Sequence, residues 1–331
     1  MNRRPLGHSE LMVTPMGLGL AALGRPGYIN LGHAEDLDRN YDVSAMERHA
    51  HEVMDAAWHG GIRYFDAARS YGRAEQFLSS WLASRNIDTD AVVVGSKWGY
   101  TYTADWQVEA EKHEVKEHSL AVLKRQTEES LTLLDEHLDL YQIHSATLAS
   151  GVLSNQAVLS ELQRLKTLGL HIGLTLSGPN QAETLRRALD VRHDGHPLFE
   201  TVQATWNLLE RSAEAALAEA QQAGLGVIVK EALANGRLTS RNQRPGFAQR
   251  RKQLEEIAAA QQTTMDGLAL AAAMAQPWAT VVLSGAATVE HVRANLQALD
   301  VDWTPELEEA LAFLTESPDD YWKIRSNLAW N

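Results

Sequence analysis

Residues 62–72 read Ile-Arg-Tyr-Phe-Asp-Ala-Ala-Arg-Ser-Tyr-Gly, and the expected fold is built outward from this stretch. It begins as a short apolar strand and runs into a turn. Asp66 stands at the end of the strand, and the phenol of Tyr71 follows in the turn. A carboxylate at the mouth of a buried strand is costly unless it is paired or hydrogen-bonded. The stretch therefore predicts that other strands supply partners for Asp66.

Two later strands end in side chains that can serve as these partners. One apolar strand ends in Lys97, and the next ends in His144. The carboxyl ends of parallel strands lie at one edge of a sheet, where α/β enzymes carry their active sites. We therefore predict that Asp66, Tyr71, Lys97 and His144 converge in a catalytic site.

The same alternation of strand and helix continues along the chain from Met16. Helical segments with apolar residues every three or four positions separate eight short apolar strands. Near-continuous apolar strands form parallel sheets, and eight of them close into a barrel. We therefore predict the α/β class and a single (β/α)8 TIM-barrel domain over residues 1–331. An N-terminal β-hairpin is expected within residues 3–15, and extra C-terminal helices are expected after residues 288 and 304.

Composition argues against several classes of function. The formal net charge is −13 at pH 7, which disfavours nucleic acid and an anionic membrane surface as partners. The chain contains no cysteine, which excludes disulfides, thiolate metal sites and cysteine nucleophiles. Its histidines lack metal-site spacing, so no metal is predicted. With no signal-like or membrane-spanning apolar run, the cytoplasm is the expected location.

The motifs around the four predicted catalytic residues resemble those of the aldo-keto reductases, in order and over nearly the whole chain. The resemblance rests on Lys97 within Gly-Ser-Lys-Trp and His144 within Leu-Tyr-Gln-Ile-His, together with Asp66 and Tyr71. Three further segments also match: residues 202–209, 232–239 and 285–295. The resemblance implies a barrel enzyme with these four residues as its catalytic tetrad.

This resemblance implies hydride transfer between a nicotinamide cofactor and a carbonyl, with NADP(H) expected in preference to NAD(H). A free phenol has a pKa of roughly 10 and is a weak acid–base group at neutral pH. Lys97, held by Asp66, is expected to lower the pKa of Tyr71. Tyr71 then donates the proton while His144 positions the carbonyl. The predicted partner is a small aldehyde, ketone or sugar, or the corresponding alcohol.

The resemblance also assigns residues to the cofactor. Gln203 matches the glutamine that binds the carboxamide, and Trp206 replaces the tyrosine that usually stacks on the nicotinamide ring. Backbone N–H groups near a helix N-terminus favour phosphate binding in the later segments. The other predicted cofactor contacts are Thr175, Leu233, Gly236, Arg237, Gly285, Ala286, His291 and Asn295.

One pair departs from the family pattern. The usual Ser-Asn pair that contacts the carboxamide falls on Thr175 and Leu176, and the side chain of Leu176 cannot form a hydrogen bond. Ser177 and Asn180 are the candidates to replace that contact.

Three aromatic residues are candidates for the substrate pocket: Tyr28, Trp98 and Trp330. They belong to residues 24–42, residues 98–117 and the C-terminal tail. Long loops beside a barrel site determine substrate specificity, but no rule relates the sequence of such a loop to the substrate. The sequence therefore leaves the substrate, the reaction direction and the oligomeric state open.

Two other functions stay open at this point. A regulatory or structural subunit would bind the cofactor and turn over slowly or not at all. A barrel aldolase would use Lys97 as a Schiff-base nucleophile, although a lysine kept charged by Asp66 is poorly suited to that role.

Overall fold

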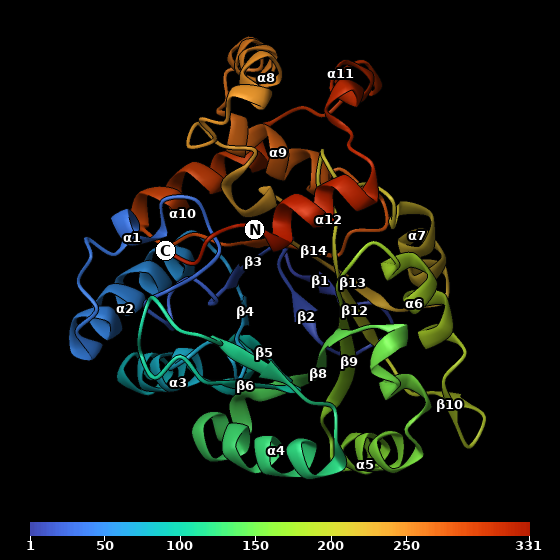
Figure 1. The fold of residues 1–331 in the computed structure, drawn as a ribbon. Helices are drawn as coiled ribbons and strands as arrows, with labels where there is room; N and C mark the ends of the chain where they lie inside the picture. The colour runs from blue at the N-terminus through green and yellow to red at the C-terminus, as the bar shows by residue number, and fades with distance from the viewer.

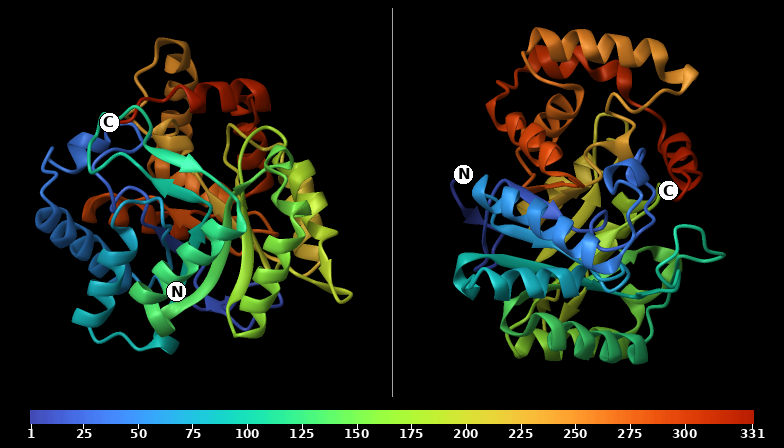
Figure 2. Two further views of the ribbon diagram at one scale, coloured as in Figure 1. Left: turned by 60° about the horizontal axis from the view of Figure 1, so that its bottom comes forward. Right: turned by 90° about the vertical axis from the view of Figure 1, so that its left-hand side faces the viewer.

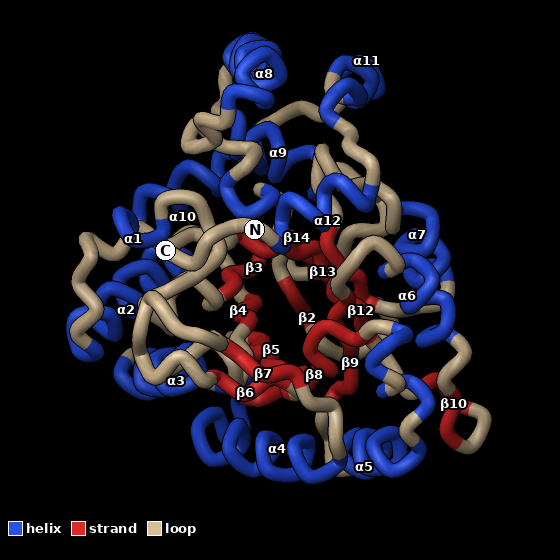
Figure 3. Tube along the Cα trace, viewed as in Figure 1, coloured by secondary structure: helices blue, strands red, loops and turns tan.

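The computed structural model describes residues 1–331, and it confirms the predicted closed barrel. Eight strands follow one another around the ring in chain order, each parallel to its neighbours (Figure 1, Figure 3). These strands are β3 (Met16–Gly19), β4 (Tyr64–Asp66), β5 (Val93–Trp98), β8 (Leu138–Ala146), β9 (His171–Leu176), β12 (Thr201–Thr205), β13 (Gly226–Lys230) and β14 (Val281–Ser284).

Helices form an outer layer around this ring of strands (Figure 2, Figure 3). The longer helices between the strands are α2 (Val43–His59), α3 (Ala74–Ser84), α4 (Leu120–Leu134), α5 (Gln156–Thr167), α6 (Gln181–Leu189), α7 (Glu214–Gln222), α8 (Ala248–Ala260) and α9 (Met265–Met274). The helices after the last strand, which confirm the predicted C-terminal additions, are α10 (Val289–Leu296), α11 (Pro305–Ala310) and α12 (Pro318–Ser326).

The N-terminal hairpin closes one end of the barrel. As predicted, β1 (Arg4–Pro5) pairs with β2 (Met12–Val13) in antiparallel fashion. Leu6 and Leu11 join an apolar cluster with Tyr64 inside the barrel. The turn requires a glycine, because Gly7 has a φ of 63° and a Cβ there would lie 2.2 Å from the backbone of Gly226. This end is therefore filled with side chains, and the opposite end is left for the site.

The two segments predicted as loops contain some regular structure. Within residues 98–117, β6 (Tyr100–Tyr102) and β7 (Glu114–Lys116) pair as an antiparallel hairpin. The short helix α1 (His33–Asp36) interrupts residues 24–42. A further small hairpin pairs β10 (Arg192–His193) with β11 (His196–Pro197).

None of the helices has both the length and the apolar character needed to span a bilayer.

A partly buried carboxyl lies at an irregularity between two barrel strands. The register shifts beside Val94, which pairs with Leu138, while Gly95 pairs with Leu140. Asp139 lies at this shift, and its Oδ2 accepts a hydrogen bond of 2.8 Å from the backbone N–H of Val94. Burial raises the pKa of the Asp139 carboxyl from 3.8 to about 6. The charged form is therefore disfavoured in the folded protein.

We expect Asp139→Asn to stabilise the protein at neutral pH. The native carboxyl holds its proton up to a higher pH than the unfolded one, so wild-type stability falls between about pH 4 and pH 6. The neutral amide keeps an acceptor for Val94 and avoids that loss, which is worth up to about 2 kcal/mol at this partly buried position. Urea denaturation at about pH 4 and pH 7 tests this, because the gain should appear only at the higher pH. The exposed Asp88→Asn serves as the control.

Candidate active site

A cavity of ≈ 530 Å³ opens at the carboxyl ends of the barrel strands. This volume lies within the usual range for small-molecule and cofactor sites. Twelve of the residues predicted to form the site line it: Tyr28, Asp66, Tyr71, His144, Gln203, Leu233, Gly236, Gly285, Ala286, His291, Asn295 and Trp330. Five others do not, namely Trp98, Lys97, Thr175, Trp206 and Arg237.

Asp66 and Lys97 form a buried ion pair on the neighbouring strands β4 and β5. The Lys97 ammonium contacts Asp66 Oδ2 and donates a 2.8 Å hydrogen bond to the carbonyl of Ala67. Asp66 Oδ1 accepts hydrogen bonds from Tyr64 Oη at 3.1 Å and from Gln203 Nε2 at 2.9 Å. A buried carboxylate with these partners is fixed in position. Burial lowers the pKa of the Lys97 ammonium, and the Asp66 carboxylate opposes that shift.

Tyr71 lies above this pair, in the turn after β4. Its ring centroid is 4.8 Å from Lys97 Nζ and 5.5 Å from the ring of His144, which it meets edge to face. The predicted lowering of the Tyr71 pKa is wrong for this structure. Removal from water raises the pKa of the phenol, and the Asp66 carboxylate adds to that effect. Tyr71 is therefore a neutral phenol that can donate a proton.

His144 is held in a neutral state on β8. Burial and the positive charges of Lys97, Lys230 and Arg25 place the pKa of its imidazole well below the usual value. The Oγ of Ser70 lies 3.4 Å from its Nδ1. A neutral imidazole can share a hydrogen bond with a carbonyl without competing as an acid. His144 is thus suited to positioning rather than to protonation.

Three residues of the cavity are suited to contact a nucleotide, and two of them were predicted from the sequence. Gln203 presents its amide to the cavity beside Asp66. Gly285 has open space where a Cβ would be, so a ligand can approach its backbone. Asn235, which the sequence did not single out, lines the cavity with a buried Oδ1 that has no partner. Unpartnered buried groups of this kind are characteristic of ligand sites.

The structure places Trp206 outside the cavity, contrary to prediction. Its ring is fully buried, lies 5.7 Å from the ring of Trp278, and donates from Nε1 to Glu214 at 3.3 Å. Gln203 lies within β12 and faces the cavity, whereas Trp206 follows the end of that strand and its ring turns to Trp278 and Glu214. Trp206 therefore packs against the helices and cannot stack on a ligand bound beside Gln203.

The alternation of side chains along β5 moves Trp98 away from the cavity. Lys97 points inward, and Trp98 points outward, with its ring 5.6 Å from that of His118. The prediction that Trp98 contacts the substrate is therefore not supported by its position. Thr175 is also buried below the cavity, where its Oγ1 accepts a 2.7 Å hydrogen bond from the backbone N–H of Ser145. Ser177 does line the cavity.

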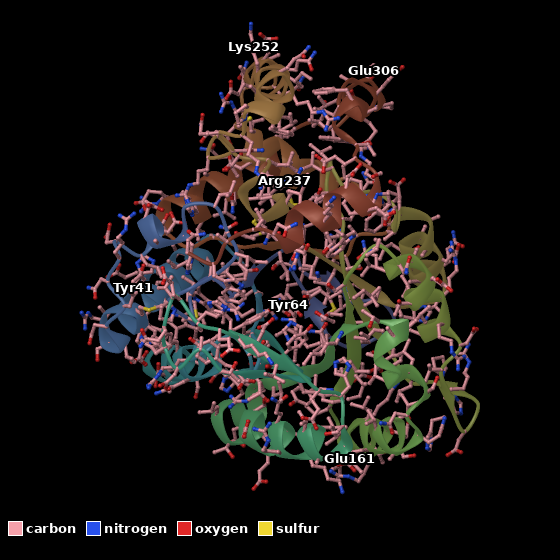
Figure 4. All side chains as sticks on the ribbon, in the orientation of Figure 1. Tyr41, Tyr64, Glu161, Arg237, Lys252 and Glu306 are labelled. Atoms are coloured by element: carbon pink, nitrogen blue, oxygen red, sulfur yellow. The ribbon has the colours of Figure 1, made fainter.

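Arg237 has a structural environment instead of the predicted cofactor contact. Its Nη2 donates to Glu316 at 2.6 Å, and its guanidinium lies 5.4 Å from the ring of Tyr321 on α12. Figure 4 shows Arg237 among the helices above the ring of strands, whereas Tyr64 lies on the barrel. Arg237 therefore fastens the C-terminal segment to the loop after β13.

Three charged side chains at the end of β13 were not predicted from the sequence. Lys230 and Glu231 line the cavity, and Arg325 from α12 reaches the same place. Arg325 Nη2 lies 2.6 Å from Glu231 Oε1, and Lys230 Nζ donates to Thr205 Oγ1 at 2.8 Å. Burial lowers the pKa of Lys230 to about 8, while Arg325 and Lys230 lower that of Glu231 to about 2 despite its burial. Lys230 is the last residue of β13, and its position at a strand end was the sequence feature that could have identified it as a site residue.

The placement of Lys97 also bears on the aldolase alternative. Its side chain has no exposed surface, contacts Asp66 and lies outside the cavity lining. A Schiff-base nucleophile must reach the substrate carbonyl as a free amine. The buried ion pair therefore disfavours an aldolase that acts through Lys97.

Comparison with known proteins gives a consistent result. Residues 15–311 match the model of the Aldo/keto reductase family. The uncharacterized oxidoreductase YqkF of Bacillus subtilis (strain 168) is 24% identical over 345 residues, covering 98% of this chain and 99% of the relative. An NADH-specific methylglyoxal reductase of Escherichia coli (strain K12) is 25% identical over 332 residues, covering 91% of this chain and 94% of the relative.

The fold is similar to that of a solved family structure. The aldo-keto reductase AKR11C1 from Bacillus halodurans (holo form) superposes with a TM-score of 0.74 at 23% identity, covering 96% of this chain and 97% of the other. The family match spans most of the chain, and the same closed barrel carries the tetrad-like cluster. The chain therefore belongs to the Aldo/keto reductase family of oxidoreductases.

Proposed function

We propose that this protein is an NAD(P)H-dependent oxidoreductase that interconverts a carbonyl and its alcohol, with Tyr71 as proton donor and acceptor. The observation that carries the proposal is the position of Tyr71. The phenol borders the cavity, with Lys97 Nζ 4.8 Å and the His144 ring 5.5 Å from its ring centroid. The proposed catalytic residues remain Asp66, Tyr71, Lys97 and His144.

Each of these residues has a distinct part in the proposed reaction. A bound nicotinamide supplies or accepts the hydride. Tyr71 gives its proton to the carbonyl oxygen, and the buried Lys97 ammonium stabilises the negative charge that develops on the phenol. Asp66 holds that ammonium in place, and the neutral His144 shares a hydrogen bond with the substrate oxygen. The reverse sequence serves alcohol oxidation.

NADP(H) is the proposed cofactor because one cationic side chain, Arg241, lines the cavity together with Gly285. Arg241 and His291 both line it, and Arg241 was not predicted from the sequence. The charge of Arg241 is partly compensated, since Arg241 forms an ion pair with Asp36 and Asp266 also lines the cavity. Burial lowers the pKa of His291, so its imidazole adds little positive charge at neutral pH. A carboxylate at such a position favours the unphosphorylated ribose of NAD(H). The ratio of the affinities for NADPH and NADH thus measures whether the guanidinium of Arg241 or the nearby carboxylates dominate in this part of the cavity.

The proposal predicts that purified protein oxidises reduced nicotinamide when a carbonyl is added. The assay follows the absorbance of NADPH and NADH with a panel of aldehydes, ketones and sugars, including methylglyoxal, the substrate that one relative's name gives. Thermal-shift titration with each nucleotide gives the preference, because a ligand of the native state raises apparent stability. Tight binding with single-turnover oxidation but no steady-state turnover would instead identify the regulatory subunit.

The cytoplasmic location of the protein stays a prediction.

A further inference from the structure

Arg25 is a buried cation beside the proposed proton donor. It follows β3 in the segment 24–42, lines the cavity, and is only 3% exposed. Its guanidinium carbon lies 5.2 Å from the ring centroid of Tyr71. The reaction described above does not require it. A guanidinium in this place needs another explanation, because burying a charge is costly unless its donors are satisfied.

The donors of Arg25 are only partly satisfied within the protein. Nη1 makes both of its hydrogen bonds, to the carbonyl of Ser70 at 2.9 Å and to Glu114 Oε2 at 3.0 Å. Nε is buried without a partner, and the protein provides no acceptor for Nη2. Nε–H and Nη2–H lie on the same edge of the guanidinium. This edge is the one that binds a carboxylate through two parallel hydrogen bonds.

Aromatic rings restrict the guanidinium of Arg25 from several sides. Its carbon lies 5.1 Å from the ring centroid of Tyr28 and 4.8 Å from that of Trp330. Trp330 is held in turn by stacking on His113 at 3.9 Å. Cation–π contacts favour a fixed charge but accept no hydrogen bond from its N–H groups. The rings therefore hold Arg25 in place while its Nε and Nη2 still lack an acceptor.

We propose that Arg25 binds a carboxylate on the substrate, so that the enzyme acts on a short oxo acid or the corresponding hydroxy acid. This inference rests on the proposed carbonyl reduction. The contact with Tyr71 places the carboxylate a few bonds from the carbonyl that Tyr71 and His144 receive. A carboxylate fits better than a phosphate dianion, because Glu114 lies beside Arg25 and repels the larger charge more strongly. Arg25 is thus assigned as a specificity-determining residue.

The first test uses binding and does not depend on turnover. Oxamate carries a carboxylate and cannot be reduced like an oxo acid, and oxamide is its neutral counterpart. Calorimetry and thermal shift, with and without NADP⁺, should detect oxamate binding that is stronger than oxamide binding by about 10- to 100-fold. Equal affinity for the two compounds would overturn the proposal, even if the protein reduces neutral aldehydes.

Variants then assign the effect to Arg25. The kcat/KM ratio of glyoxylate to methyl glyoxylate should fall by about 10- to 100-fold in Arg25→Met and recover in part in Arg25→Lys. Glu114→Gln removes the competing carboxylate, so oxamate should bind more tightly than it does to wild type. This second variant tests the idea if Arg25→Met fails to fold. Lys112→Met, which removes an exposed cation from the loop between β6 and β7, is the matched control.

The outcomes separate this inference from the proposed function. An unchanged substrate ratio in Arg25→Met, or no gain in oxamate affinity in Glu114→Gln, would refute the role of Arg25 alone. Failure of the wild-type protein to reduce any carbonyl would refute the proposed function, while oxamate binding would still report on the anion site.

Discussion

Tyr71→Phe is expected to lower kcat for carbonyl reduction by a factor of about 100 to 10,000, the usual contribution of general acid catalysis. The variant loses one hydroxyl and keeps the ring that contacts His144 and Arg25. Nucleotide affinity should therefore stay within about twofold of wild type, because no proposed cofactor contact involves the phenol oxygen. Steady-state kinetics and nucleotide titration measure the two effects separately.

The matched control for this experiment is Tyr100→Phe. Tyr100 also lines the cavity, and its ring lies 4.9 Å from that of His144. Loss of its hydroxyl should cost less than about tenfold in kcat, since it donates no proton in the proposed reaction. Full turnover by Tyr71→Phe, or equal losses in the two variants, would remove Tyr71 from its role.

Lys97→Met should produce the largest loss of stability among single substitutions at the site. The change leaves the Asp66 carboxylate 2% exposed, with only neutral donors such as Tyr64 and Gln203. Removing one partner of a buried ion pair costs about 3–5 kcal/mol, because the other charge remains buried and unpaired. Urea denaturation at neutral pH measures the change in the free energy of unfolding.

A double variant distinguishes the structural from the chemical role of this pair. Lys97→Met combined with Asp66→Asn removes both charges, so most of the lost stability should return. Activity should not return, because the phenol of Tyr71 would then have no ammonium below its ring. A double variant as unstable as Lys97→Met would contradict the charge-burial explanation, and an active one would contradict the catalytic proposal.

Much of the barrel could be predicted because its signals are local. Apolar strands alternate with helices along the chain, and parallel strands carry their end residues to one face of the ring. Asp66, Tyr71 and His144 therefore meet at the cavity, with Lys97 directly beneath them. The order of residues along the chain therefore determines on which strand, and at which end of that strand, each side chain lies.

Two of the errors came from the face of the strand rather than its end. Trp98 ends β5 and Trp206 directly follows β12, but each is an odd number of residues from an inward-pointing side chain. Both rings turn away from the cavity, Trp98 toward His118 and Trp206 toward Trp278. The odd spacing can be counted in the sequence, so the outward orientation of both tryptophans was predictable from it.

The sequence by itself determined the barrel, the strand ends and the four residues proposed for catalysis. Tertiary structure alone decided the walls of the cavity, because Arg25, Glu114 and Trp330 come from segments that share no period with the strands. Their meeting depends on contacts between residues far apart in the chain, 89 positions for Arg25 and Glu114 and more for Arg25 and Trp330, which join a loop, a hairpin and the C-terminal tail. Such contacts leave no local pattern, since packing and charge pairing act between neighbours in space and not along the chain.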